Sequence, residues 1–229
     1  MALATRDVAA WVRAFAVLVA QHRDELTRLD AEIGDADHGT YLDRGTTAVV
    51  AMLDGPLDGP LDTQPPEPPG ELLRRVGMTL VSTVGGASGP LYGTFFLRAG
   101  QALGTDPRAD AVRTASALRA GVDGVAARGK AAVGDATMLD AFVPAVAAFE
   151  RAADREGLAA AFVSAHAAAE KGCAATIPLR ARKGRASYLG DRSIGHQDPG
   201  ATSVVLLFRA ALDAGLGADA GRDVGAGEA

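Results

Sequence analysis

The stretch DAEIGDADHGTY, residues 30–41, gathers three carboxylates in one short turn. Asp30, Asp35 and Asp37 would repel one another, and their pKa values would rise, unless a cation lies between them. Carboxylate oxygens are the ligands that Mg²⁺ and Ca²⁺ prefer, and Gly34 lets the backbone turn tightly. A metal site is one interpretation of this turn. A solvated turn in which Asp37 caps the next helix is the other, and spacing alone leaves both open.

An EF-hand does not explain this turn. Residues 35–46 lack the third oxygen ligand of that loop and carry Thr46 where its closing glutamate belongs. His38 lies inside the turn, and a lone histidine is more often structural than a ligand or a base.

The segment GGASGP, residues 85–90, predicts a tight glycine-rich turn. Backbone N–H groups there, next to a helix that begins near Pro90, would suit phosphate oxygens, with Ser88 beside them. The segment matches neither a Walker A loop nor a nucleophile elbow. A helix end followed by a new helix start is the structural alternative.

The segment RARKGRASYLGDR, residues 180–192, concentrates basic side chains around Tyr188 in a chain with a net charge of -5. Its guanidinium groups could hold phosphate, it could bind RNA with Tyr188 stacking on a base, or it could be a solvated surface. The acidic net charge argues against RNA. Taken together, the acidic turn, the glycine turn and the arginines match metal–nucleotide binding and phosphoryl transfer, without a candidate covalent nucleophile.

Helices must position these segments. Apolar residues recur at helical spacing, which predicts eight helices, near residues 6–28, 40–54, 71–83, 91–103, 109–127, 137–152, 157–171 and 201–215. TLVSTV at 79–84 is a candidate strand, but nothing obvious would pair with it. The pattern therefore predicts an all-α fold in one domain.

The domain is expected to span residues 1–216. The proline-rich stretch 54–70 cannot be helical and predicts an exposed connection, and the Gly- and Ala-rich residues 217–229 predict a disordered tail. The single cysteine, Cys173, fits a reducing compartment. With no signal peptide and no long apolar run, we expect a cytoplasmic protein that binds neither membranes nor nucleic acid.

Four motifs resemble one known family. EIGDADHG, GGASGPLYGTFF, VGDATMLD and RARKGRASYLGDRSIGHQDPGATS closely resemble the nucleotide-binding L subunits of dihydroxyacetone kinases, in register from about residue 6 to 212. The resemblance implies an all-α barrel of eight antiparallel helices, with the nucleotide on the loops at one rim.

The resemblance also implies site residues. Asp30, Asp35 and Asp37 would hold two Mg²⁺ ions that bridge to the phosphates of ADP or ATP. The nucleotide would be contacted by His38, Gly39, Thr40, Tyr41, Ala87, Ser88, Gly129, Met138, Arg185, Asp198, Pro199 and Gly200. In this scheme Ser88 and nearby amides hold phosphate, Arg185 neutralises its charge, and Met138 lines the base.

Family members of this type work with separate partners. A K subunit holds dihydroxyacetone covalently, and in the phosphotransferase-system form an M subunit with phosphohistidine rephosphorylates bound ADP. The chain carries only the L part, which favours that form over direct use of free ATP. Ala136 stands where the family often has lysine, a change expected to loosen the nucleotide. The alternatives are an L subunit for another small ketose, such as erythrulose, and a nucleotide-loaded regulator.

Overall fold

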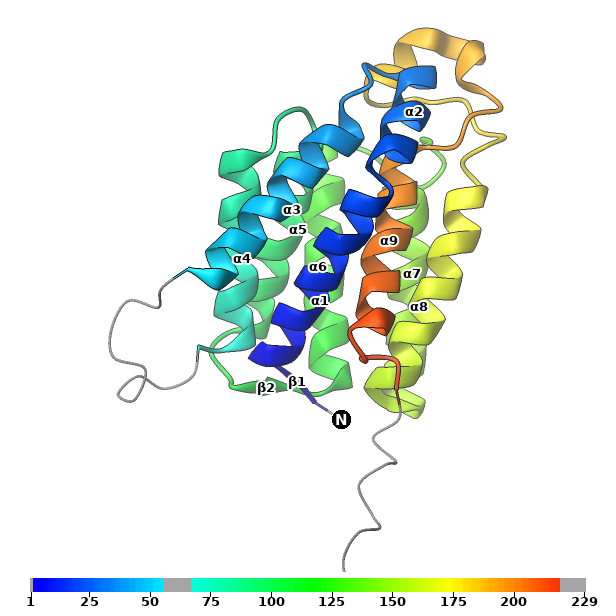
Figure 1. The fold of residues 1–229 in the computed structure, drawn as a ribbon. Coiled ribbons are helices and arrows are strands. Elements are labelled where there is room, and N and C mark those ends of the chain that lie inside the picture. Colours follow the sequence, from blue (N-terminus) through cyan, green and yellow to red (C-terminus); the bar gives the residue numbers. More distant parts are fainter. Residues whose placement is uncertain (1, 56–66, 219–229) are drawn as a thin grey trace, which may run out of the picture.

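The computed structural model describes residues 2–55 and 67–218. Within these ranges the chain is mostly helical (Figure 1). The helices are α1 (Thr5–Gln21), α2 (Arg23–Ile33), α3 (His38–Asp54), α4 (Pro69–Thr83), α5 (Ser88–Leu103), α6 (Ala111–Gly129), α7 (Leu139–Arg155), α8 (Gly157–Ala174), the 3-10 helix η1 (Arg185–Ser193) and α9 (Pro199–Asp213). Two short strands, β1 (Leu3–Ala4) and β2 (Arg108–Ala109), pair antiparallel. The all-α prediction is confirmed.

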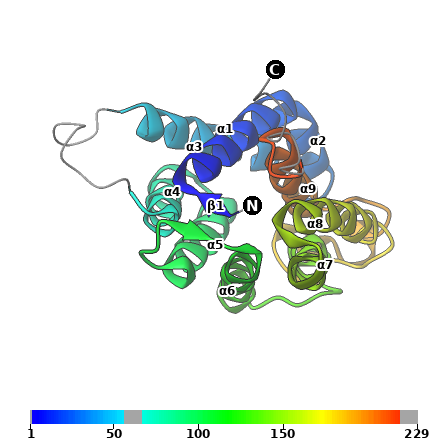
Figure 2. The same ribbon diagram turned by 90° about the horizontal axis from the view of Figure 1, so that it is seen from below.

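Most of the helices follow one another around a ring (Figure 2). Contacts run from α1 to α3, onward through α4, α5, α6, α7 and α8 to α9, and from α9 back to α1. Neighbours in this ring run in opposite directions (Figure 1). As a result, α3, α5, α7 and α9 all begin at one end of the ring, which we call the upper rim because it lies at the top of Figure 1.

Aromatic side chains fill the inside of the ring and fix the helices relative to one another. The largest fully buried side chains include Trp11, Phe15, Tyr92, Phe95, Phe96, Phe142, Phe149, Phe162 and Phe208. The indole N–H of Trp11 donates to the carbonyl of Leu207 at 2.8 Å, which ties α1 to α9. Burying each such side chain stabilises the fold by roughly 1.5–3 kcal/mol, so the upper rim rests on a rigid base.

The helix predicted over residues 6–28 proves to be two helices. The chain breaks at His22, and α2 then packs on α3 and α9 outside the ring, at the end where α1 stops. Its apolar stripe of Leu26, Leu29 and Ile33 is buried by that packing. Because α2 continues to Ile33, Asp30 belongs to the last turn of a helix and not to a loop.

Other boundaries also differ from the prediction. Residues 79–83 of the candidate strand form the end of α4. Asp54 ends α3, and α4 starts at Pro69, where proline is tolerated in the first helical turn, so both ends of the proline-rich stretch are helical. The rest of that stretch, 56–66, and the tail from 219 lie outside the described residues. The domain limits therefore stay a prediction. Across the described ranges, every helix is too short or too polar to cross a bilayer.

Candidate functional site

The segments singled out from the sequence meet at the upper rim around one pocket of about 570 Å³. Cavities of this size accommodate cofactors and small ligands. The first residues of α3, α5, α7 and α9 all line it. The positive ends of four helix dipoles therefore converge on the pocket. That arrangement favours a ligand with several negative charges.

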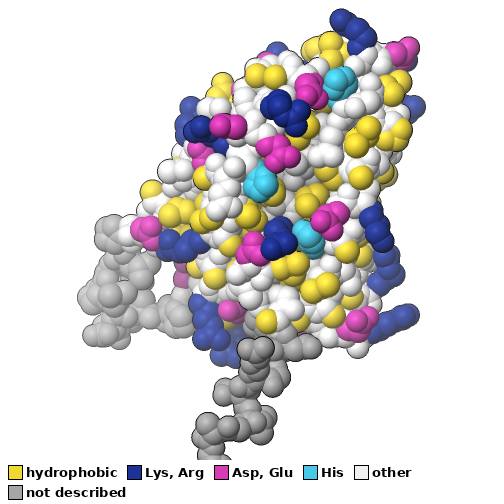
Figure 3. All heavy atoms as spheres, turned by 45° about the vertical axis from the view of Figure 1, so that its right-hand side comes forward, with side chains coloured by type: hydrophobic (Ala, Val, Ile, Leu, Met, Phe, Trp, Pro, Cys, Tyr) yellow, Lys and Arg dark blue, Asp and Glu magenta, His cyan; other side chains and the backbone are white. Residues whose placement is uncertain are grey.

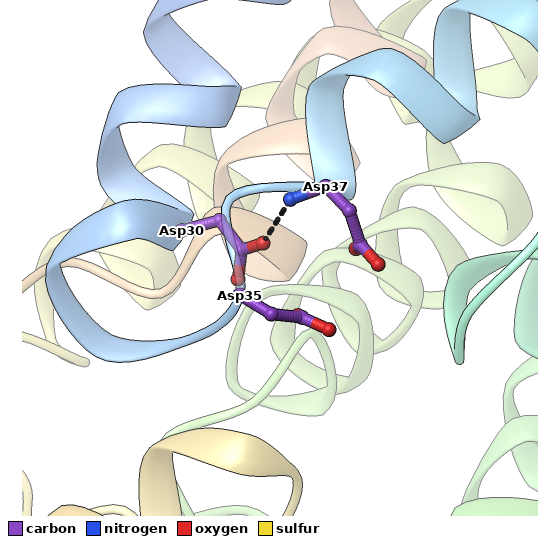
Figure 4. A group of neighbouring side chains, drawn as sticks. All are labelled: Asp30, Asp35 and Asp37. Atoms are coloured by element: carbon purple, nitrogen blue, oxygen red, sulfur yellow. Dashed lines mark hydrogen bonds between the residues drawn. The ribbon is translucent and has the colours of Figure 1, made fainter.

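Asp30, Asp35 and Asp37, which we call the acid cluster, form one side of the pocket. One carboxylate oxygen from each lies within 4.8 Å of the others. Figure 4 shows how the turn brings them together. Oδ2 of Asp30 accepts hydrogen bonds from the backbone N–H groups of Asp37 at 2.8 Å and of His38 at 3.2 Å. These bonds fold the turn back onto the end of α2.

The backbone of this turn leaves little freedom for substitution. A Cβ added at Gly34 would lie 2.2 Å from Oδ1 of Asp30, so any side chain there must displace that carboxylate. Ala36 has a φ of 60°. This left-handed conformation costs a non-glycine residue about 1 kcal/mol. The hydrogen bonds to Asp30 hold the turn against that strain.

The charge of the acid cluster is only partly compensated. Burial, together with the charges of Asp35 and Asp30, raises the pKa of Asp37. Among the described residues one cation forms an ion pair with the cluster: Nε of Arg185 lies 2.6 Å from Oδ2 of Asp35. Three convergent carboxylates with a single positive partner are a donor set that fits a hard divalent cation such as Mg²⁺.

His38 lines the pocket as an uncharged group. Its Nε2 lies 3.0 Å from Oγ of Ser203, which in turn lies 2.8 Å from the hydroxyl of Tyr92. Burial lowers the pKa of His38 to about 4. The ring is therefore neutral near pH 7 and does not compensate the acid cluster.

The glycine turn leads directly into α5. Gly86 has a φ of 65°, a conformation that favours glycine, and its added Cβ would lie 3.6 Å from both carboxylate oxygens of Asp37. Ala87 and Ser88 line the pocket beside it. The first N–H groups of a helix have no partner within it, so this turn presents donors next to the acid cluster.

Part of the pocket wall is apolar. That part is lined by Leu91, Val125, Ala131, Met138 and Leu139. A Cβ added at Gly200 would lie 3.2 Å from Cβ of Met138 and 2.9 Å from Oδ2 of Asp198, so α9 approaches this wall closely. A ligand with an anionic part and a flat apolar part matches this mixed lining.

Asp198 caps α9 and lines the pocket. Its Oδ2 accepts a hydrogen bond from the N–H of Ala201 at 2.6 Å. Burial above all, and the charges of Asp140 and Asp30, raise the pKa of Asp198 to about 7. This carboxyl group therefore exchanges a proton near neutral pH.

The basic segment is folded and reaches over the pocket. Its N–H at Arg182 donates to the carbonyl of Asp135 at 3.0 Å, and Ala186 packs in a small cluster with Ile33 and Ala136. Tyr188 is 86% exposed. On the face drawn in Figure 3, basic and acidic side chains are interspersed, and no broad patch of one sign covers the residues shown in colour.

The structure brings most of the predicted site together. The acid cluster lines the pocket, as do His38, Ala87, Ser88, Gly129, Met138, Arg185, Asp198, Pro199 and Gly200. Gly39, Thr40 and Tyr41 do not. An added Cβ at Gly39 would lie 2.1 Å from the carbonyl oxygen of Arg23, so this glycine serves helix packing. Thr40 is exposed, and the ring of Tyr41 lies against Gly85 and Gly86 of the glycine turn. The ligand contacts of all these residues stay predictions.

Several lining residues were missed. Thr137 and Lys183 belong to segments that the sequence analysis had singled out, but Leu91, Val125 and Arg128 lie on helices. An apolar residue at helical spacing carries no signal that separates a pocket wall from the core. Arg128 offers a weak signal, because it directly precedes the predicted contact Gly129.

An all-α ring with a pocket of helix N-termini, an acid cluster and an apolar wall defines a class of helical protein whose pocket suits an anionic ligand and a divalent cation. Comparison with known proteins gives the family. Residues 32–213 match the family described as the DAK2 domain. The chain is 43% identical over 210 residues to the ADP-binding subunit DhaL of the PEP-dependent dihydroxyacetone kinase of Escherichia coli, covering 91% of this chain and 96% of that protein. The chain therefore belongs to the DAK2 domain family.

Two further relatives are longer than this chain. It is 35% identical over 209 residues to the D-erythrulose kinase of Mycolicibacterium smegmatis, covering 91% of this chain but 35% of that protein. The crystal structure of the dihydroxyacetone kinase from C. freundii in complex with AMP-PNP and Mg²⁺ is similar with a TM-score of 0.66 and 26% identity, covering 93% of this chain and 34% of that chain.

Proposed function

We propose that this chain is the nucleotide-carrying subunit of a dihydroxyacetone kinase. It would hold ADP or ATP with two Mg²⁺ ions and pass a phosphoryl group to dihydroxyacetone on a separate K subunit in the cytoplasm, with ADP rephosphorylated by an M subunit. The observation that carries this proposal is a pocket whose lining includes both the acid cluster and an apolar wall. The 43% identity to an ADP-binding subunit supports it.

The residues of the chain have distinct tasks in this proposal. The acid cluster would hold the cations, which neutralise phosphate charge. The N–H groups at the start of α5 would orient phosphate oxygens, and Arg185 would leave Asp35 to pair with them. Met138 and its apolar neighbours would hold the base. No described residue is assigned as a nucleophile, so catalysis would rest on positioning and charge, as is general for phosphoryl transfer.

A kinase subunit for another ketose is the second candidate, because the chain is also similar to D-erythrulose kinase. Both candidates use the same pocket, and the ketose would lie on the partner. The experiment is phosphoryl transfer by the purified chain mixed with the K subunit of the E. coli enzyme. The reaction is run with ATP, or with PEP and the phosphotransferase proteins, on dihydroxyacetone and on erythrulose. Transfer to neither ketose from either donor would contradict the proposal and leave a regulatory nucleotide-binding protein.

The bound nucleotide separates the two donors. If ADP is a resident cofactor, the purified and dialysed chain releases about one equivalent of ADP when it is denatured. An empty chain that takes up ATP freely would indicate direct use of ATP. The side chain of Ala136 packs against Ile33 and Ala186 and offers no cation to the pocket. This favours weaker retention of ADP than a lysine at this position would give.

A further inference from the structure

Asp140 is a buried carboxylate that the proposed function does not use. Its side chain is 4% exposed, and it does not line the pocket. Oδ1 accepts a hydrogen bond from the N–H of Gly134 at 2.6 Å, and Oδ2 accepts one from the N–H of Thr137 at 2.8 Å. Both oxygens therefore accept hydrogen bonds from the backbone of one short turn that precedes α7.

That turn needs an external support. Lys130, Gly134 and Ala136 have φ values of 48°, 95° and 56°, so the backbone between α6 and α7 enters the left-handed region three times. Two of these residues are not glycine and resist that conformation. Such a backbone cannot form a regular ladder of hydrogen bonds, and bonds from charged acceptors are stronger than neutral ones. The Asp140 carboxylate supplies two of them.

The turn lines the pocket, and its residues Asp135 and Ala136 also contact the basic segment and Ile33. Ala131, Ala136, Thr137 and Met138 line the pocket from this segment. Leu91 and Val125 line the same pocket. The acid cluster comes from α2 and the turn that follows it, and the glycine turn comes from between α4 and α5. Asp140 makes no hydrogen bond to either of these segments among the described residues.

We infer that Asp140 is a positioning residue for the base of the nucleotide. Its two hydrogen bonds hold the backbone of residues 134–137 and thereby fix where Met138 meets the base. The inference rests on the proposed function. It implies that a ligand with a base and a ligand of phosphates alone depend on Asp140 to different degrees.

The test compares ADP with tripolyphosphate, each titrated calorimetrically in Mg²⁺ against the full chain. In Asp140→Asn a single carbonyl oxygen replaces two acceptors, and the amide NH₂ faces one of the two N–H donors. We expect the affinity for ADP to fall about tenfold or more while the affinity for tripolyphosphate changes less than about twofold. Asp110→Asn is the matched control, because Asp110 accepts from the N–H of Arg113 at the other end of the ring, and neither affinity should change.

Equal losses for both ligands, or no loss for ADP, would overturn the inference. If Asp140→Asn does not fold, Gly134→Ala must show the same selective loss, since alanine strains this turn at a φ of 95° while its Cβ meets no atom within 4 Å. A wild-type chain that binds neither ligand would contradict the proposed function itself, and with it this inference.

Discussion

Replacing Asp198 with asparagine is expected to make the free energy of unfolding less dependent on pH. Burial, with the charges of Asp140 and Asp30, raises the pKa of this carboxyl group from 3.8 to about 7. The folded protein then keeps a proton that the unfolded chain releases. The stabilisation is fully present below about pH 4 and is lost as the pH rises through about 7.

The size of the effect follows from the shift in pKa. A shift of about three pKa units corresponds to at most about 4 kcal/mol. Asp198 lines an open pocket where water screens its charge, so we expect about 1–2 kcal/mol. Asparagine keeps an acceptor for the N–H of Ala201, now bonded at 2.6 Å, and the cap of α9 should survive.

Urea unfolding at pH 5 and pH 8, in EDTA and without nucleotide, measures this contribution. From pH 5 to pH 8 the free energy of unfolding should fall by about 1–2 kcal/mol more in wild type than in Asp198→Asn. Asp110→Asn, which alters an exposed cap of α6, should follow wild type. The pKa of His38 is lowered to about 4, so the stability that this neutral ring contributes is lost as the pH falls below about 6.5. This loss is the same in all three proteins. Parallel losses in wild type and Asp198→Asn would refute the reasoning.

Three further predictions concern other residues. Gly34→Ala should weaken ADP binding in Mg²⁺ about tenfold, because its Cβ would lie 2.2 Å from a carboxylate oxygen of the acid cluster. Gly55→Ala is the control, because its Cβ would lie 3.5 Å from the nearest atoms, and it should not weaken binding. Equal ADP affinities of the two variants in calorimetric titrations would contradict this prediction. Arg185→Gln should raise the affinity of the nucleotide-free chain for Mn²⁺, measured by electron paramagnetic resonance, and lower its affinity for ADP, because the guanidinium pairs with the acid cluster at 2.6 Å. Arg182→Gln, at an exposed cation of the same segment that does not line the pocket, is the control, and unchanged Mn²⁺ binding in Arg185→Gln would count against the competition. Burial raises the pKa of Cys173 to about 11, so a thiol reagent at pH 8 should label it only after unfolding, and fast labelling of the folded chain would contradict this burial.

The helices could be predicted from the sequence because their apolar faces repeat with helical period. Phe142, Val146 and Phe149 show that spacing in α7, and they are buried. The break at His22 could not be predicted, because α2 leaves the ring to pack on α3 and α9, and only tertiary contacts set that direction. The 3-10 helix in the basic segment could not be predicted either, because a polar segment with glycines has no periodic apolar face.

The site was predictable where function requires unusual residues in a short stretch. Three aspartates around Gly34 left a metal site and a solvated turn both open, and the family resemblance favoured the metal site and implied the nucleotide contacts. The sequence could not indicate that the starts of four helices converge on one pocket, since this follows from the alternating direction of the ring. Nor did it reveal the support that Asp140 gives to its turn, because an aspartate after a helix start usually serves the local backbone.

The central claim is that the acid cluster holds the cations through which the nucleotide binds. Its most direct test is the dissociation constant of ADP, measured by calorimetry in Mg²⁺ and in EDTA. Wild type should bind ADP about a hundredfold tighter in Mg²⁺, and Asp35→Ala and Asp37→Ala should lose that difference. Asp191→Ala removes an exposed acid that pairs with Arg180 on the same rim and should keep it. If both acid-cluster variants retain the full Mg²⁺ dependence, the claim is wrong.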